Sequence, residues 1–128
     1  MGKLVCDEVL DAALQYIEDN ADYITVCEGA PTTYEHAHSD KGTGAGKALA
    51  NAVPSFTGPA EGDANGRKTT VDEEAAMTVD FSGAADHVAL CDAGNTLLLY
   101  VTTCTEQALV AANTVTIPAW DIEIADPT

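Results

Sequence analysis

The stretch GAADHVALCDAGNTLLLYVTT, residues 83–103, holds two apolar runs on either side of a short turn. The runs, HVALCDA and TLLLYVTT, have the apolar and β-branched composition of strands. Between them, Ala93, Gly94 and Asn95 suit a hairpin turn. The stretch therefore predicts a β-hairpin at the centre of a sheet, and its side chains indicate packing more than chemistry.

Further short strands are predicted on both sides of this hairpin. RKTTV and AMTVDFS alternate before it, with Met77, Val79 and Phe81 on one face of the second. TVTIPAW and DIEIAD follow it, and Pro118 marks a bend or an edge between them. Strands so closely spaced predict an antiparallel sheet or a β-sandwich over residues 68–126.

An amphipathic helix is predicted over residues 3–20, because apolar residues recur there at spacings of three and four. A β-branched run, YITVC, follows at residues 23–27. We therefore expect an α+β fold, mainly β, in which the N-terminal helix packs on an antiparallel sheet or sandwich.

Residues 30–67 show no convincing periodicity and are rich in glycine and proline. Ordinary connections are much shorter, so this segment is predicted to be a functional arm or lobe that reaches a neighbouring subunit. Within it, KALANAV at residues 47–53 suggests a short helical turn. The length of the chain predicts a single domain over residues 1–128.

Charge restricts the possible partners. There are 21 acidic and 5 basic residues, a formal net charge of −16, and no basic residue follows Lys68. Such a surface repels phosphate and anionic lipid, so we expect neither nucleic acid nor membrane as a partner. No apolar run approaches the roughly 18 residues that span a bilayer.

Four cysteines, Cys6, Cys27, Cys91 and Cys104, are scattered among apolar neighbours without a CxxC pair. This pattern favours buried free thiols over a zinc site, whose ligands would be clustered.

One cluster has the residue types of a metal site. YEHAHSD contains Glu35, His36, His38 and Asp40, and two histidines at i and i+2 would share one face of a strand. A solvated loop is the simpler interpretation. GTGAGKA at residues 42–48 lacks the first glycine and the Ser or Thr of a phosphate-binding loop. EGDANG at residues 61–66 lacks the glycine spacing of a calcium loop.

The order of EGAPTTY, GDANGRKTTV, the hairpin and NTVTIPAWDIEIADP resembles small virion structural proteins of tailed bacteriophages. The resemblance covers most of the chain and is weakest over residues 35–60. It implies a non-enzymatic, β-rich subunit with no catalytic residues, no cofactor and no resident metal.

The first functional hypothesis is accordingly a capsid decoration or cement protein. It would be made in the host cytoplasm and bound to the major capsid protein on the exterior of the virion, as a homo-oligomer, most simply a homotrimer. A neck, connector or tail subunit is the closest alternative, because an acidic lumen would let DNA slide. A small metal-binding module that uses Glu35, His36, His38 and Asp40 is the remote alternative.

Overall fold

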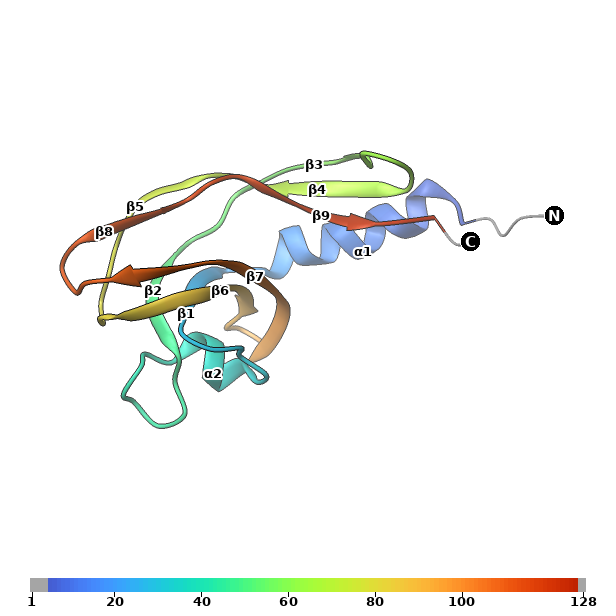
Figure 1. Ribbon diagram of the computed structural model, residues 1–128. Helices are drawn as coiled ribbons and strands as arrows, with labels where there is room; N and C mark the ends of the chain where they lie inside the picture. The colour runs from blue at the N-terminus through green and yellow to red at the C-terminus, as the bar shows by residue number, and fades with distance from the viewer. Residues whose placement is uncertain (1–4, 127–128) are drawn as a thin grey trace. The chain divides into compact units, whose positions relative to one another are not determined.

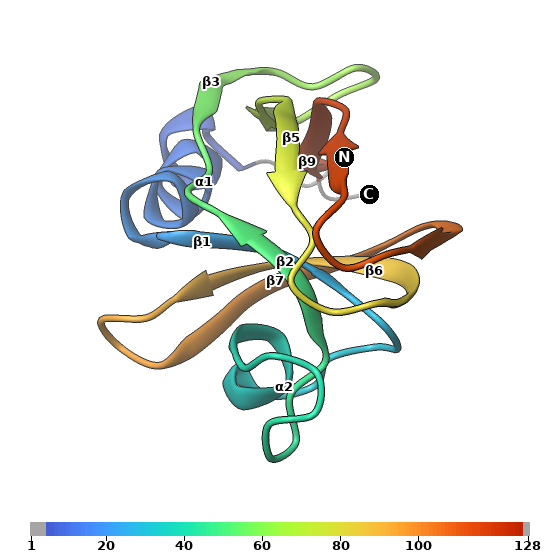
Figure 2. The same ribbon diagram turned by 90° about the vertical axis from the view of Figure 1, so that its left-hand side faces the viewer.

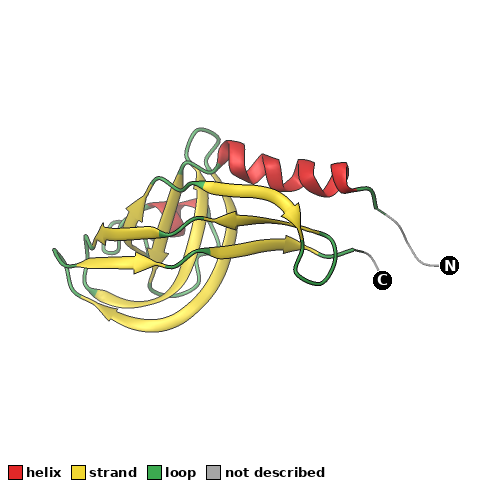
Figure 3. Ribbon diagram, turned by 90° about the horizontal axis from the view of Figure 1, so that it is seen from above, coloured by secondary structure: helices red, strands yellow, loops and turns green. Residues whose placement is uncertain are grey.

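The computed structural model describes residues 5–126 (Figure 1). The fold is α+β and mainly β, as predicted from the sequence, and its named strands pair antiparallel (Figure 3). The elements within these residues are α1 (Asp7–Asn20), β1 (Tyr23–Cys27), α2 (Tyr34–His38), β2 (Ala48–Ala52), β3 (Phe56–Glu61), β4 (Arg67–Val71), β5 (Glu74–Thr78), β6 (Gly83–Asp92), β7 (Leu97–Leu109), β8 (Thr114–Ile117) and β9 (Trp120–Ile124).

The chain forms two compact units that interleave along the sequence. One combines the N-terminal segment to Asp19 with residues 55–73 and the C-terminal segment from Pro118; the other combines residues 20–54 and 74–117. The expectation of one folding domain over residues 1–128 stays a prediction.

The first unit contains α1 and the sheet β3-β4-β9. Leu10 and Leu14, four residues apart on one face of α1, are buried. Side-chain bonds join α1 to β4: the Arg67 guanidinium donates to Asp11 at 2.7 and 3.3 Å, and the Thr69 hydroxyl donates to Glu18 at 2.7 Å. The expected helix-on-sheet arrangement is therefore present in this unit.

The helix differs from its prediction at its start. It was expected over residues 3–20, but the structure begins it at Asp7, and residues 3 and 4 lie outside the described part. Its apolar stripe is also narrower than expected, since Val9 is 59% exposed.

The second unit is built on the sheet β2-β1-β6-β7. The hairpin of β6 and β7 forms as predicted, and the Asp92 carboxylate accepts bonds from the backbone and side chain of Asn95 in its turn. One placement was wrong: β6 is internal, between β1 and β7, whereas β7 is at the edge of the sheet. The reason is that β1 pairs with the other side of β6.

Helix α2 covers one face of this four-stranded sheet (Figure 2). Its residue Ala37 is fully buried against Ala89 and Cys91 of β6. Tyr23, Tyr34, Leu98 and Val101 complete this small core as partly buried side chains.

The segment 30–67 is not the irregular arm that its composition predicted, because α2, β2 and β3 lie within it. The expected helical turn at residues 47–53 was also wrong: β2 is a strand paired with β1. Alanine-rich residues 48–52 favour a strand here because a ready partner strand satisfies their backbone groups. The outer side of β2 is covered near Leu49, whose carbonyl accepts from Asp80 N–H at 2.7 Å and from Phe81 N–H at 3.2 Å.

The later strands follow the sequence pattern with small differences. The run AMTVDFS was expected as one strand, but β5 ends at Thr78, and Phe81 is 38% exposed while Met77 and Val79 are buried. Pro118 lies between β8 and β9, as predicted. Ile117 of β8 and Ile122 of β9 are buried, whereas Val115 and Ile124 of the same strands are only partly buried.

Candidate functional site

The residues of the 35–40 cluster do not share a strand face, because Tyr34–His38 form the helix α2. Thr33 caps this helix, its side-chain oxygen accepting from His36 N–H at 3.1 Å. On a helix, residues at i and i+2 point to different sides. The predicted strand-face pairing of His36 and His38 was therefore wrong.

Three side chains of the cluster have different neighbours. The Thr32 backbone N–H donates to His36 Nδ1 at 3.2 Å, and Glu35 Oε1 accepts from Ala45 N–H at 3.4 Å. His38 stacks on Tyr34 and meets Tyr23 edge-on, with ring centroids 4.8 Å apart in both pairs. Over residues 5–126, no three His, Cys, Asp or Glu side chains gather in a way that could hold a metal ion. These placements give the metal hypothesis no support.

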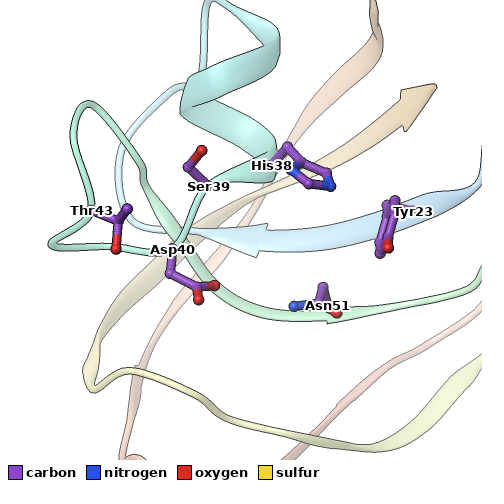
Figure 4. A pocket seen from close by; sticks show the side chains of 6 residues that line it. All are labelled: Tyr23, His38, Ser39, Asp40, Thr43 and Asn51. Atoms are coloured by element: carbon purple, nitrogen blue, oxygen red, sulfur yellow. The ribbon is translucent and has the colours of Figure 1, made fainter. Parts of the chain in front are cut away.

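A polar hollow of about 360 Å³ lies beside this cluster (Figure 4). Tyr23 of β1 and His38 of α2 line it together with Asn51 of β2, and the α2–β2 connection contributes the rest of the lining. The residues from that connection are Ser39, Asp40 and Thr43. The Asn51 amide donates to Asp80 at 3.3 Å. The hollow thus offers hydroxyl, imidazole, carboxylate and amide groups that can form hydrogen bonds.

A second polar network joins the end of β1 to the start of β6. The Ala84 N–H and the Lys41 ammonium each lie 2.9 Å from the Glu28 carboxylate, and both lower its pKa. His87 Nδ1 and the Gly29 N–H each lie 2.8 Å from Asp86 Oδ1 and lower the pKa of that carboxyl. The network binds two strand ends together and holds its carboxylates in the charged form.

Acid should therefore weaken the fold through this network. A carboxyl whose pKa is lower in the folded state contributes stability that is present above its unfolded pKa and is lost as pH falls through the folded value. The ordinary values are 4.5 for Glu28 and 3.8 for Asp86, so the loss should begin below about pH 4.5. Melting temperatures measured from pH 7 to 2.5 test this expectation. Glu28→Gln with Asp86→Asn should flatten the acid limb.

A control for this experiment is Glu73→Gln, which removes an exposed carboxylate outside the network. We expect the control to keep the acid limb of the unmodified protein. An equally steep acid limb in the double variant would contradict the role of the network.

The thiols divide into two classes. Cys27 and Cys91 are buried, as predicted, whereas Cys6 and Cys104 are exposed, so the prediction was wrong for that pair. Burial raises the pKa of the Cys91 thiol to about 12 and also raises that of Cys27. The pKa of Cys104 is raised as well, because its sulfur is partly desolvated although the residue as a whole is exposed. A thiol with a raised pKa is a poor nucleophile at neutral pH. Cys27, Cys91 and Cys104 are therefore held as neutral thiols at neutral pH.

Three of the five Lys and Arg residues form ion pairs with carboxylates. Lys41 pairs with Glu28 in one unit, at 2.9 Å. In the other unit, Arg67 pairs with Asp11 and Glu61, and Lys68 pairs with Asp63 and Asp121. These three basic side chains are therefore paired with neighbouring carboxylates. They do not form a cationic patch that could bind phosphate.

β7 forms one edge of the four-stranded sheet in the second unit. Residues 103–108, TCTEQA, are exposed on both faces of the strand, and Val110 just beyond it is 57% exposed. The hairpin was predicted at the centre of the sheet, and the edge position of β7 was not predicted. A signal was present: the apolar run stops at Val101 and seven polar or small residues follow. The cluster of Tyr23, Tyr34 and His38 had no such signal, because a strand and a helix bring it together.

No protein-family model matches the chain, and neither a curated protein nor a solved structure matches it. Within residues 5–126, neither helix has the length and apolar character needed to cross a membrane. A functional inference therefore depends on the residues and their arrangement.

Proposed function

We propose that this protein is a non-enzymatic structural subunit of a tailed-bacteriophage virion. Its role would be that of a capsid decoration or cement protein, bound to the major capsid protein on the outside of the head. It would be made in the host cytoplasm and assemble as a homotrimer. The resemblance of its sequence elements to small virion proteins suggests this class.

The observation that carries the proposal is the acidic surface. The net charge is −16, and three of the five basic residues are held in ion pairs. A subunit that must cover a DNA-filled shell gains from a surface that binds neither DNA nor anionic lipid, since both repel it. Affinity for the shell would then come from apolar area and strand edges, repeated over many copies.

The candidate site supports a structural role in a second way. In the described part of the chain, the buried thiols have raised pKa values, His38 packs against two tyrosines, and the Glu35 and His36 side chains have separate neighbours. These groups are arranged for packing and local hydrogen bonding, which suits a structural role.

Localisation on virions tests the proposal directly. Purified virions of a phage that encodes this chain should contain it by mass spectrometry, and gold-labelled antibody should decorate the heads in electron micrographs. Label confined to the neck or tail would replace decoration with the connector or tail role. Absence from virions in both measurements would overturn the proposal.

Binding to empty shells is the quantitative version of this test. Shells assembled from the major capsid protein of the same phage should bind the purified chain to saturation and melt at a higher temperature. Ligand linkage predicts the increase, because a subunit that binds only the intact shell stabilises it. Unchanged melting after incubation at saturating concentration would count against a cement role.

A further inference from the structure

We propose that the polar hollow beside α2 binds a neutral sugar, either a single pyranose ring or the terminal ring of a longer glycan. All the residues that line the hollow belong to the second unit, so the inference rests on the structure of that unit alone. It does not depend on the proposed virion role, and either proposal can fail without the other.

The size and the lining of the hollow indicate a small polar ligand. Its volume of about 360 Å³ is within the range of pockets that hold small molecules, roughly 300–1,000 Å³. Such pockets are usually lined mainly by apolar side chains. Here each lining side chain carries a polar group: a phenol, an imidazole, a carboxylate, an amide and two aliphatic hydroxyls. A polyhydroxylated molecule fits this lining better than an apolar one.

Most of these polar groups are open to a ligand. Within residues 5–126, the side-chain oxygens of four lining residues form no hydrogen bond with the protein: Tyr23, Ser39, Asp40 and Thr43. Asn51 donates one amide N–H to Asp80 at 3.3 Å, and its amide has a second N–H and an acceptor oxygen. A ligand in the hollow can therefore form hydrogen bonds without breaking bonds of the fold.

The donors and acceptors of the lining match a sugar better than an organic cation. A sugar hydroxyl both donates and accepts, as do the hydroxyls of Tyr23, Ser39 and Thr43. The ionised Asp40 carboxylate only accepts, and its two oxygens can take two neighbouring hydroxyls of one ring. An ammonium group only donates, so it would leave the donors of the lining without a partner.

The charges around the hollow disfavour anions. Neither lysine nor arginine is among its lining residues in the described part of the chain, and Asp40 contributes a carboxylate. Lys41, next in the sequence, pairs with Glu28 at 2.9 Å, and the Lys47 ammonium lies beside Gly29. The formal net charge of −16 adds a general repulsion of negative ligands. Phosphorylated and acidic sugars are therefore excluded from the proposed class.

Two strands and a helix fix the position of the lining. Thr25 of β1 lies opposite Asn51 of β2, and residues directly opposite share a sheet face. Tyr23, two residues before Thr25, projects from the same face. His38 of α2 meets the Tyr23 ring edge-on, so the helix stands on this face. In Figure 4, Asp40 and Tyr23 lie at opposite ends of the lining, with His38 and Asn51 between them.

The α2–β2 connection is held by its own backbone. The Thr43 N–H donates to the Asp40 carbonyl at 3.0 Å, and the Ala48 N–H donates to the Ser39 carbonyl at 3.1 Å. The Lys41 N–H donates in turn to the Ala48 carbonyl at 2.8 Å. This wall of the hollow is therefore preformed, which lowers the entropy lost when a ligand binds. Its side chains can also be replaced without removing these bonds.

Titration with simple sugars tests the proposal. The probes are the methyl glycosides of glucose, galactose, mannose and N-acetylglucosamine, and amide chemical shifts of ¹⁵N-labelled protein report binding. At least one probe should give saturable shifts that gather at residues 23, 38–43 and 51. We expect a dissociation constant in the millimolar range, because an open hollow leaves part of the ring in water. No saturable shift at these residues from any of the four probes would overturn the proposal.

An organic cation tests the class of ligand. Tetramethylammonium, titrated in the same way, should give no saturable shift at the hollow, because it can use neither the hydroxyls nor the amide as donors. Saturable binding of tetramethylammonium that is tighter than that of every sugar would overturn the assignment to sugars.

Matched variants locate the site. Asp40→Asn should weaken binding of the best sugar at least about tenfold, because a charged acceptor is lost. Thr43→Val keeps the side-chain shape, removes a hydroxyl and should weaken binding about threefold or more. Both variants should melt as the unmodified chain does, because the groups removed form no hydrogen bond within the described residues. A role in packing would lower the melting temperature and leave binding to the folded protein unchanged.

The control is Asp7→Asn, the same chemical change at an exposed position of α1 in the other unit. We expect this variant to bind the sugar as the unmodified chain does. Unchanged affinity in both Asp40→Asn and Thr43→Val, or an equal loss in Asp7→Asn, would overturn the assignment of the sugar to this hollow.

Discussion

Replacing Leu90 by alanine is expected to lower the free energy of unfolding by about 2–5 kcal/mol. Leu90 is fully buried in β6, where it lies opposite Ile24 of β1 on one side and Tyr100 of β7 on the other. Truncation removes apolar contacts and leaves a cavity that strands paired on both sides cannot readily close. Urea denaturation, followed by circular dichroism, measures the loss.

The matched control is Leu97→Ala, which makes the same chemical change on the neighbouring strand. Leu97 is 43% exposed, so its truncation should cost less than about 1 kcal/mol. Leu98 is intermediate in exposure and packs on the Ala37, Ala89 and Cys91 core, so Leu98→Ala should fall between the two. Similar losses for Leu90→Ala and Leu97→Ala would contradict the assignment of β6 as internal and β7 as the edge.

Gly66→Ala should give the second large effect, a loss of at least about 2 kcal/mol in the other unit. Gly66 has a φ of +74°, where a side chain is strained, and it lies at the turn that leads into β4. A Cβ at this position would also collide with the Ile124 carbonyl of the paired strand β9, only 2.0 Å away. The collision involves backbone, so relief requires β4 and β9 to move apart.

Gly42→Ala separates these two causes. Gly42 also has a positive φ, +89°, but nothing lies within 4 Å of an added Cβ. This variant should show the backbone strain alone, about 1–2 kcal/mol. If Gly66→Ala were no more destabilising than Gly42→Ala, the close approach of β9 to Gly66 would be wrong.

Together, Leu90→Ala and Gly66→Ala also test the prediction of a single domain, because they lie in different units. In a calorimetric scan, one cooperative domain would show one transition that both substitutions lower. Two independently folding units would show two transitions, each lowered by one substitution.

Local pattern in the sequence was enough to predict most elements. The apolar spacing of α1, the β-branched run of β1, and the β6–β7 hairpin with its Ala93–Asn95 turn depend on interactions between near neighbours. Such interactions leave a periodic signal that is visible without knowing the rest of the fold. The prediction of an acidic protein that repels phosphate likewise needed only a count of charges.

The failed predictions concern partners that are distant in sequence. The composition of residues 48–52 does not indicate a strand. They form β2 because their backbone pairs with β1. His36 and His38 point to different sides because residues 34–38 form a helix that Thr33 caps. His38 contacts the rings of Tyr23 and Tyr34. A short helix over residues 34–38 gave too few turns for a periodic pattern.

Sequence alone thus determined the class of the fold, the hairpin and the acidic character of the protein, because these depend on local pattern and composition. Tertiary structure alone decided that β6 is internal and β7 is the edge, since strand order depends on whether β1 pairs with one side of the hairpin or the other. Both orders satisfy the same local preferences. They differ in which strand of the hairpin has a neighbour on both sides and which has a neighbour on one side only.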